Sequence, residues 1–86
     1  MSRLALTPKQ REIMKCVLEA TDAGEVLTIR GLKEKMSYGP DVTLQAIQSS
    51  IRYLEQHGVL VRSYEKIFSR RQVIVKPTLS GYRIFR

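Results

Sequence analysis

The clearest hydrophobic pattern in the chain lies between residues 43 and 61, in TLQAIQSSIRYLEQHGVLV. Four aliphatic residues recur at helical spacing and predict a buried face: Leu44, Ile47, Ile51 and Leu54. A second stripe, turned well away from the first, carries amide, hydroxyl and guanidinium groups: Gln45, Gln48, Ser49 and Arg52. The pair His57-Gly58 should end this helix, because Gly readily adopts the left-handed conformation after a helix.

Two shorter patterns precede this segment. Thr7-Pro8, with Gln10 three residues after Thr7, predicts a capping box and a first helix that fades near residues 22–24. Its apolar stripe comprises Ile13, Cys16, Val17 and Ala20. Val26 and Leu27 predict a short extended piece.

Thr28 should then cap a second helix that runs to about Met36. Gly31 inside this helix is unfavourable by about 1 kcal/mol relative to Ala, which suggests that another helix approaches closely there. The start of the third helix stays open at this point. Either Gly39 caps the second helix with Pro40 at the first position of the third, or Asp41 is the N-cap.

The last third of the sequence predicts a β-hairpin. Residues 59–64 form one arm and residues 72–76 the other, with residues 65–71 as the loop. Because the loop lacks Asn-Gly, we expect a longer, mobile tip. Ile67 and Phe68 in this loop should fold back onto the core or contact a protein. Residues 78–82 predict a short terminal turn or helix.

Composition and charge narrow the function. Eighty-six residues suffice for one domain, expected over 1–86. The net charge of +7 is uneven: residues 1–43 carry seven basic and six acidic residues, whereas residues 44–86 carry eight basic and two acidic. Basic charge therefore gathers on the third helix and the hairpin, which favours a nucleic-acid partner.

Several other classes of protein lack support in the sequence. No apolar run approaches the ~20 residues of a membrane span, and no signal-peptide pattern follows Met1, so we expect a cytoplasmic, nucleoid-associated protein without membrane contact. The single cysteine, Cys16, allows no internal disulfide and no metal site by itself. Ser49-Ser50 has no His–Asp companions, and we predict no enzyme, no catalytic residues, no metal and no cofactor.

Two families share parts of this pattern. LTPKQREIMKCVLEA, at residues 6–20, resembles the start of the DNA-binding domain of LexA repressors, and the segments 28–36 and LEQHGVLVRS continue the likeness. RRQVIVKPTLSG is similar to the wing strand of MarR-type regulators and the segment after it. The resemblance implies an α+β winged helix-turn-helix fold, with a three-helix core and a C-terminal β-hairpin wing. It does not imply self-cleavage, because nothing here matches the serine–lysine domain of LexA.

These patterns together predict a sequence-specific double-stranded DNA-binding regulator of transcription, of the prokaryotic type and acting as a repressor or an activator. The third helix should lie in the major groove, where Gln and Arg pair with base edges, and the basic wing on the backbone or in the minor groove. The expected DNA-binding residues are Thr28, Arg30, Thr43, Gln45, Gln48, Ser49, Arg52, Arg62, Lys66, Arg70 and Arg71.

The alternative is a winged helix that binds nucleic acid without regard to sequence, or that serves as a protein–protein adaptor in replication or mobile-element maintenance. A homodimer and a protein partner are both open. A single module of this size buries only about 600–1,000 Å² on DNA, so paired copies would strengthen binding.

Overall fold

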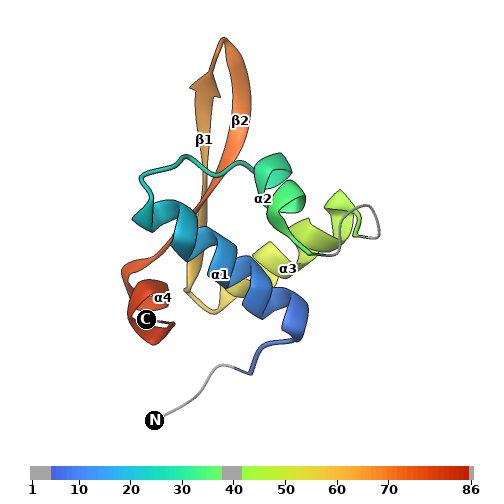
Figure 1. The fold of residues 1–86 in the computed structure, drawn as a ribbon, viewed down its shortest axis with the longest axis vertical. Coiled ribbons are helices and arrows are strands. Elements are labelled where there is room, and N and C mark those ends of the chain that lie inside the picture. The colour runs from blue at the N-terminus through green and yellow to red at the C-terminus, as the bar shows by residue number, and fades with distance from the viewer. Residues whose placement is uncertain (1–4, 38–41, 86) are drawn as a thin grey trace.

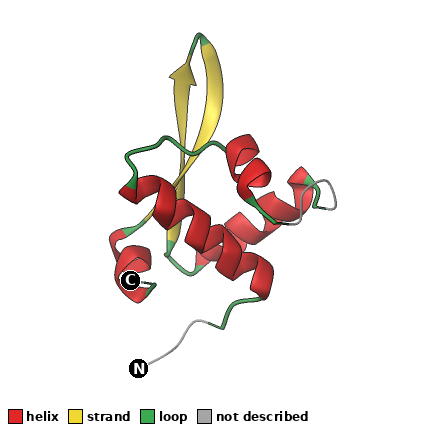
Figure 2. Cartoon of the chain, in the orientation of Figure 1, coloured by secondary structure: helices red, strands yellow, loops and turns green. Residues whose placement is uncertain are grey.

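Four helices form one end of the molecule, and a two-stranded antiparallel hairpin projects from them along its longest axis (Figures 1 and 2). The structure is a computed structural model that describes residues 5–37 and 42–85, except for the side chain of Ile67. The predicted α+β class is therefore confirmed. The elements are α1 (Pro8–Asp22), α2 (Ile29–Lys35), α3 (Leu44–Gln56), β1 (Leu60–Ile67), β2 (Arg70–Pro77) and α4 (Leu79–Ile84).

Each of the four helices begins after a threonine whose hydroxyl accepts a backbone N–H from three residues further on. The caps are Thr7, Thr28, Thr43 and Thr78. In α1 the predicted capping box is complete, because the Thr7 N–H also donates to the Gln10 side chain at 3.0 Å. These caps satisfy N–H groups that have no partner inside the helix.

The start of α3 differs from both sequence-based alternatives. Gly39, Pro40 and Asp41 lie outside the described residues, and the helix begins at Leu44 with Thr43 as its N-cap. The Thr43 hydroxyl accepts the Ala46 N–H at 3.0 Å. At its other end α3 stops as predicted: His57 is the C-cap and Gly58 has φ +73°, in the left-handed region.

The core lies where the three longest helices meet the base of the hairpin. Ile47, Ile51 and Leu54 of α3 are fully buried, as their spacing predicts. Leu44 was placed on that same face but keeps 36% of its surface exposed. Leu44 is the first residue of α3 and lies at the edge of the core, not in its middle.

The buried face of α1 is wider than predicted. Besides Ile13, Cys16, Val17 and Ala20, the side chains of Met14 and Leu18 are buried. Met14 and Leu18 line a surface depression together with Phe85, which follows α4. The end of the described chain thus covers a second side of α1.

The extended piece before α2 is confirmed, and it joins the hairpin. The Val75 N–H of β2 donates to the Leu27 carbonyl at 2.8 Å, and Thr28 forms an isolated antiparallel bridge with Ile74. The base of β2 is therefore bonded to β1 on one edge and to the chain before α2 on the other. Backbone bonds fix the start of α2 relative to the hairpin.

The hairpin loop is much shorter than predicted. The strands pair without interruption from Leu60↔Pro77 to Ile67↔Arg70, which leaves a two-residue turn. Its residues, Phe68 and Ser69, have φ of +50° and +66°, as a type I′ turn requires. The expectation of a longer loop was wrong because the turn uses positive φ without the usual Asn or Gly.

Of the two alternatives for Phe68, folding back onto the core is wrong, because the side chain is 94% exposed. Contact with a protein stays a prediction.

The short helix α4 is held against the junction between α3 and β1. The Thr78 N–H donates to the Val59 carbonyl at 3.1 Å, and the Thr78 hydroxyl donates to the Gly58 carbonyl at 2.6 Å. Gly81 is buried there, and a Cβ at this position would lie 2.1 Å from the Val59 carbonyl oxygen. Only glycine fits at this contact.

The close helix–helix approach predicted at Gly31 is absent. A Cβ at Gly31 would meet only Thr28 Oγ1 at 3.2 Å and Leu27 Cδ1 at 3.6 Å. Those atoms belong to the cap of the same helix and to the residue before it. Gly31 therefore leaves room for the N-cap rather than for a neighbouring helix.

Candidate nucleic-acid interface

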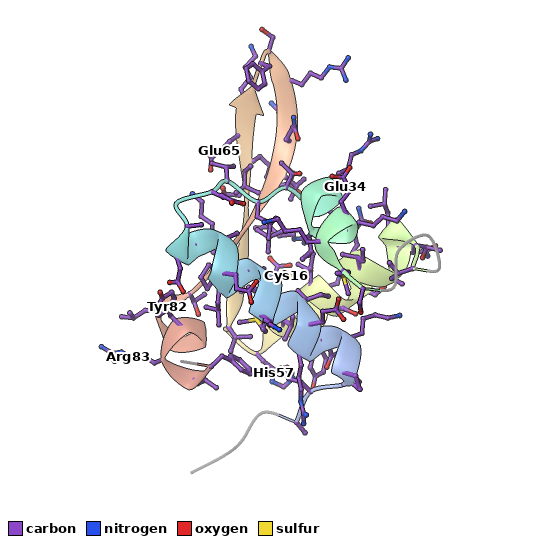
Figure 3. All side chains as sticks on the ribbon, viewed as in Figure 1. Cys16, Glu34, His57, Glu65, Tyr82 and Arg83 are labelled. Carbon is purple, nitrogen blue, oxygen red and sulfur yellow. The ribbon has the colours of Figure 1, made fainter. Side chains whose placement is uncertain are left out.

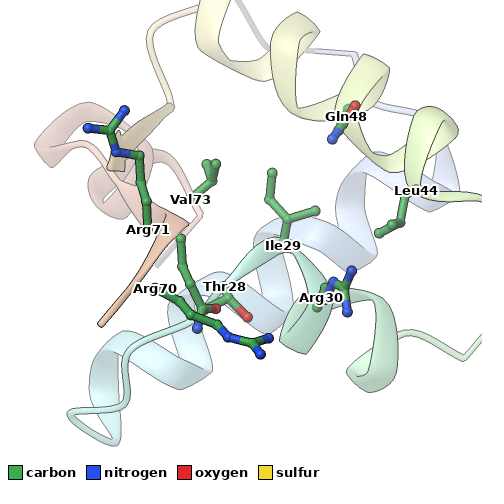
Figure 4. A pocket seen from close by; sticks show the side chains of 9 residues that line it. Thr28, Ile29, Arg30, Leu44, Gln48, Arg70, Arg71 and Val73 are labelled. Atoms are coloured by element: carbon green, nitrogen blue, oxygen red, sulfur yellow. The ribbon is translucent and has the colours of Figure 1, made fainter. Parts of the chain in front are cut away.

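A groove opens between α3, the first turn of α2 and the distal half of β2 (Figure 4). Its volume is about 430 Å³. Three segments distant in sequence supply its walls: Thr28, Ile29, Arg30, Leu44, Gln48, Arg70, Arg71, Gln72 and Val73. Five of the eleven predicted DNA-binding residues are among them, namely Thr28, Arg30, Gln48, Arg70 and Arg71.

The remaining polar stripe of α3 lies outside this lining but faces solvent. Gln45, Ser49 and Arg52 are all exposed, as is Gln48. Gln45 lies three residues before Gln48 and Arg52 four residues after it, and Ser49 lies four residues after Gln45 and three before Arg52, so the four side chains occupy neighbouring parts of the helix surface. The stripe therefore extends the groove wall along α3.

The electrostatics of the groove are positive. Arg30 enters from α2, and Arg70 and Arg71 enter from β2 (Figure 4). Lys66 is the cross-strand neighbour of Arg71 and is also exposed. Among the residues that the structure describes, no carboxylate forms an ion pair with these side chains or with Arg52. Their charges remain available to an anion.

Other cations, in contrast, are already paired with acidic residues. Lys76 lies 3.1 Å from Glu65, and this hydrogen bond, together with one from Ser63, holds the pKa of the Glu65 carboxyl below its usual value. Lys35 lies 2.9 Å from Glu25, and its pKa is raised by that hydrogen bond.

Arg62 is placed differently from the other predicted wing residues. Its Nε lies 2.8 Å from Glu55 Oε1 on α3, and only 27% of its side chain is exposed. The contact is an ion pair without hydrogen-bond alignment, since Arg62 Nε makes no hydrogen bond. Because the guanidinium joins β1 to α3, the structure does not bring Arg62 to the groove.

Two predicted contact residues have a structural role. The hydroxyls of Thr28 and Thr43 accept backbone N–H groups at 3.0 Å as helix caps. Thr28 nonetheless lines the groove, and Thr43 is exposed immediately before Leu44. Neither cap prevents the side chain from meeting a ligand.

Sequence reasoning missed the apolar floor of the groove. Ile29, Leu44 and Val73 line it beside the cations, whereas the sequence pattern assigned Leu44 to a buried helix face and Val73 to an arm of the hairpin. The only signal was Leu44, whose position at the first turn of α3 left it at the edge of the buried face. Gln72 was missed as well, since it falls between the two arginines and the buried part of β2.

Two titratable groups outside the groove, Cys16 and His57, have different surroundings. Cys16 lies on the buried face of α1, and burial, followed by the charges of Glu12 and Glu19, raises the pKa of its thiol. His57 is exposed, with its ring 4.4 Å from that of Tyr53 (Figure 3). Within the described ranges, no three His, Cys, Asp or Glu side chains come together as a metal would require.

The helices in the described part of the chain are all too short or too polar to traverse a lipid bilayer. Compared with protein-family models and with the sequences of curated proteins, the chain has no significant match.

Proposed function

We propose that this protein is a winged helix-turn-helix regulator of transcription that binds double-stranded DNA in a sequence-specific manner. In this proposal α3 lies in the major groove and the hairpin is the wing. The observation that carries it is the groove of Figure 4, which Gln48 of α3 lines together with three arginines from two other segments. A groove lined by an amide and by guanidinium groups suits a ligand that combines base edges with phosphates.

The dimensions and chemistry of α3 suit a major groove. A major groove about 12 Å wide admits one α-helix, and α3 has thirteen residues with its polar stripe exposed. Gln45 and Gln48 can each form a bidentate pair with adenine, and Arg52 with guanine. Each such pair discriminates against a wrong base by about 1–3 kcal/mol.

The cations around the groove account for affinity rather than sequence preference. Five exposed basic residues on α2, α3 and the hairpin form no ion pair with a described carboxylate: Arg30, Arg52, Lys66, Arg70 and Arg71. If each neutralises one phosphate, the logarithm of affinity falls with the logarithm of salt concentration at a slope of about −4.5. A module of this size buries about 600–1,000 Å² on DNA, so we propose that two copies occupy a paired site.

The experiment is selection of bound duplexes from a random DNA pool, followed by salt titrations on the selected sequence and on competitor DNA. Arg52→Ala should relax the preference at one base position. The double variant Arg70→Ala/Arg71→Ala should weaken binding to every duplex and make the slope shallower by about 1.8. Arg83→Ala, on α4 away from the groove (Figure 3), is the matched control and should leave both unchanged.

Other outcomes would favour a different function. A protein that enriches no sequence, yet weakens equally on all duplexes as salt rises, is a general nucleic-acid binder. If the protein binds no duplex even at low salt, it is not a DNA-binding protein. That result would favour the alternative function of a protein–protein adaptor. Unchanged sequence preference in Arg52→Ala together with Gln48→Ala would remove α3 from the major groove.

A further inference from the structure

The tip of the hairpin carries the most exposed large apolar side chain among the described residues. Phe68 occupies the first position of the two-residue turn and is 94% exposed. Its φ of +50° lies in the left-handed region, which a bulky residue rarely adopts. The turn therefore combines an unfavourable backbone conformation with an unburied aromatic ring.

Neither the positive φ nor the exposed ring of Phe68 stabilises the fold. Asn or Gly would adopt the same turn at lower cost and are preferred there, and a ring without neighbours adds no packing. Backbone strain of this kind gathers at functional sites. The exposed ring of Phe68 is therefore available to contact a partner.

The position of the ring restricts that partner. Towards the tip of the hairpin, Tyr64↔Val73 is the last cross-strand pair in contact with the core, because Val73 packs against the core cluster. Residues 65–67 of β1 continue for about 10 Å beyond that pair. The turn that holds Phe68 therefore lies beyond Arg70 and Arg71, at the far end of the hairpin (Figure 1).

Charge around the tip points to a polyanion. Lys66, Arg70 and Arg71 lie within three residues of Phe68 and are exposed. The one acidic residue of the distal hairpin, Glu65, is engaged by Lys76 and Ser63. An apolar ring surrounded by free cations fits a surface where phosphates border an apolar interior.

We propose that Phe68 inserts between adjacent base pairs from the minor groove and partly unstacks them. This inference rests on the proposed DNA-binding function, and it adds a deformation of the duplex to that function. Phe, Leu, Ile and Met act as such wedges when bordered by cations, and they kink the duplex. A lipid surface also accepts basic and aromatic residues, but Arg70 and Arg71 belong to the same groove as Gln48, and this favours the duplex.

Two variants separate the ring from the turn. Phe68→Asn supplies a residue that prefers the turn and removes the apolar ring. Phe68→Leu keeps an apolar wedge. Each is compared with the wild-type protein in affinity for a fluorescent 24-base-pair duplex of mixed sequence, in thermal unfolding, and in the linking number of a plasmid relaxed by topoisomerase at equal protein occupancy.

Phe68→Asn should unfold at the same temperature as the wild type or a higher one. Its affinity for the duplex should fall by about 5- to 150-fold, the range for losing one aromatic–base stack. The plasmid unwinding seen with the wild type should disappear in Phe68→Asn and persist in Phe68→Leu. The slope of affinity against salt should stay unchanged, because no phosphate contact is lost.

The inference fails if Phe68→Asn binds and unwinds DNA as the wild type does while Arg70→Ala/Arg71→Ala still weakens binding. That result leaves the proposed function intact. It also fails if Phe68→Asn lowers the unfolding temperature, since the ring would then stabilise the fold. Binding of the wild type to anionic lipid vesicles but to no duplex would overturn both the inference and the proposed function.

Discussion

Replacing Gly81 with Ala tests how closely α4 is held to the rest of the fold. The added Cβ would lie 2.1 Å from the Val59 carbonyl oxygen, whereas ordinary contacts begin at 3.4 Å. The backbone oxygen cannot rotate away as a side chain can. Helix α4 would have to withdraw by about 1 Å, a displacement comparable to the gap between those two distances.

The cost follows from the contacts that this movement breaks. Thr78 makes two hydrogen bonds to the α3–β1 junction, at 2.6 Å to the Gly58 carbonyl and 3.1 Å to the Val59 carbonyl. Each contributes about 0.5–1.5 kcal/mol, and forcing a methyl group into packed surroundings costs about 1–3 kcal/mol more. Ala is favoured over Gly inside a helix by about 0.5–1 kcal/mol, so the net loss is roughly 2 kcal/mol if one of the two hydrogen bonds breaks.

Urea denaturation and thermal unfolding, both followed by circular dichroism, measure this loss. The free energy of unfolding of Gly81→Ala should fall by about 2 kcal/mol. For a domain of this size the corresponding fall in Tm is about 8–16 °C. The control Ser80→Ala, at the exposed neighbouring position on α4, should change the free energy of unfolding by less than about 0.5 kcal/mol, with a correspondingly small change in Tm.

An equal or higher stability for Gly81→Ala would refute this reasoning. The helix preference of Ala would then exceed the steric cost, and α4 could not lie as close to Val59 as described.

Three further predictions concern single side chains. Arg62→Ala should lower the free energy of unfolding by at most about 1 kcal/mol, because its ion pair with Glu55 is partly exposed. It should leave the slope of DNA affinity against salt unchanged. A slope shallower by about 0.9 would show instead that Arg62 contacts a phosphate. The carboxyl of Glu65 has a pKa below the ordinary value of about 4.5, so the stability it contributes is present above that pH and is lost as the pH falls through the lower folded pKa. A carboxyl NMR titration should show this pKa rising in Lys76→Met, and an unmoved pKa would contradict the assigned cause. The thiol of Cys16, whose pKa burial raises, should react slowly with a disulfide reagent at pH 8 and rapidly in urea. Equal rates would show that the buried face of α1 does not shield this thiol from solvent.

Local sequence signals predicted most of the helices. Thr7 with Gln10 and Thr28 marked two helix starts because a capping hydroxyl acts on the residues next to it. The start of α3 was missed because Gly39, Pro40 and Asp41 gave stronger breaking signals than Thr43. The end at Gly58 was predicted correctly because the need for positive φ is also local.

Features set by distant contacts were not predictable in the same way. The turn at Phe68-Ser69 has no Gly or Asn, so its shortness follows from strand pairing and not from turn preference. Met14 and Leu18 of α1 line a depression with Phe85, a residue far away in the sequence. The pairing of Arg62 depends on Glu55, which lies on another element.

The candidate site was likewise only partly predictable from the sequence. Spacing alone identified the polar stripe of α3, because helical periodicity fixes which side chains share a face. Spacing could not reveal that Gln48 shares a groove with Arg30 and Arg71, since that proximity arises only after three segments pack together.

The hydrogen bond between Leu27 and Val75 has a mechanical consequence for this groove. It ties the start of α2 to β2, so two of the three walls belong to one hydrogen-bonded unit, and α3 packs on α2 through fully buried side chains. The opening between the walls is therefore preset before any ligand arrives. A bound molecule must conform to that spacing, and the rearrangement needed for a close fit falls mainly on the ligand.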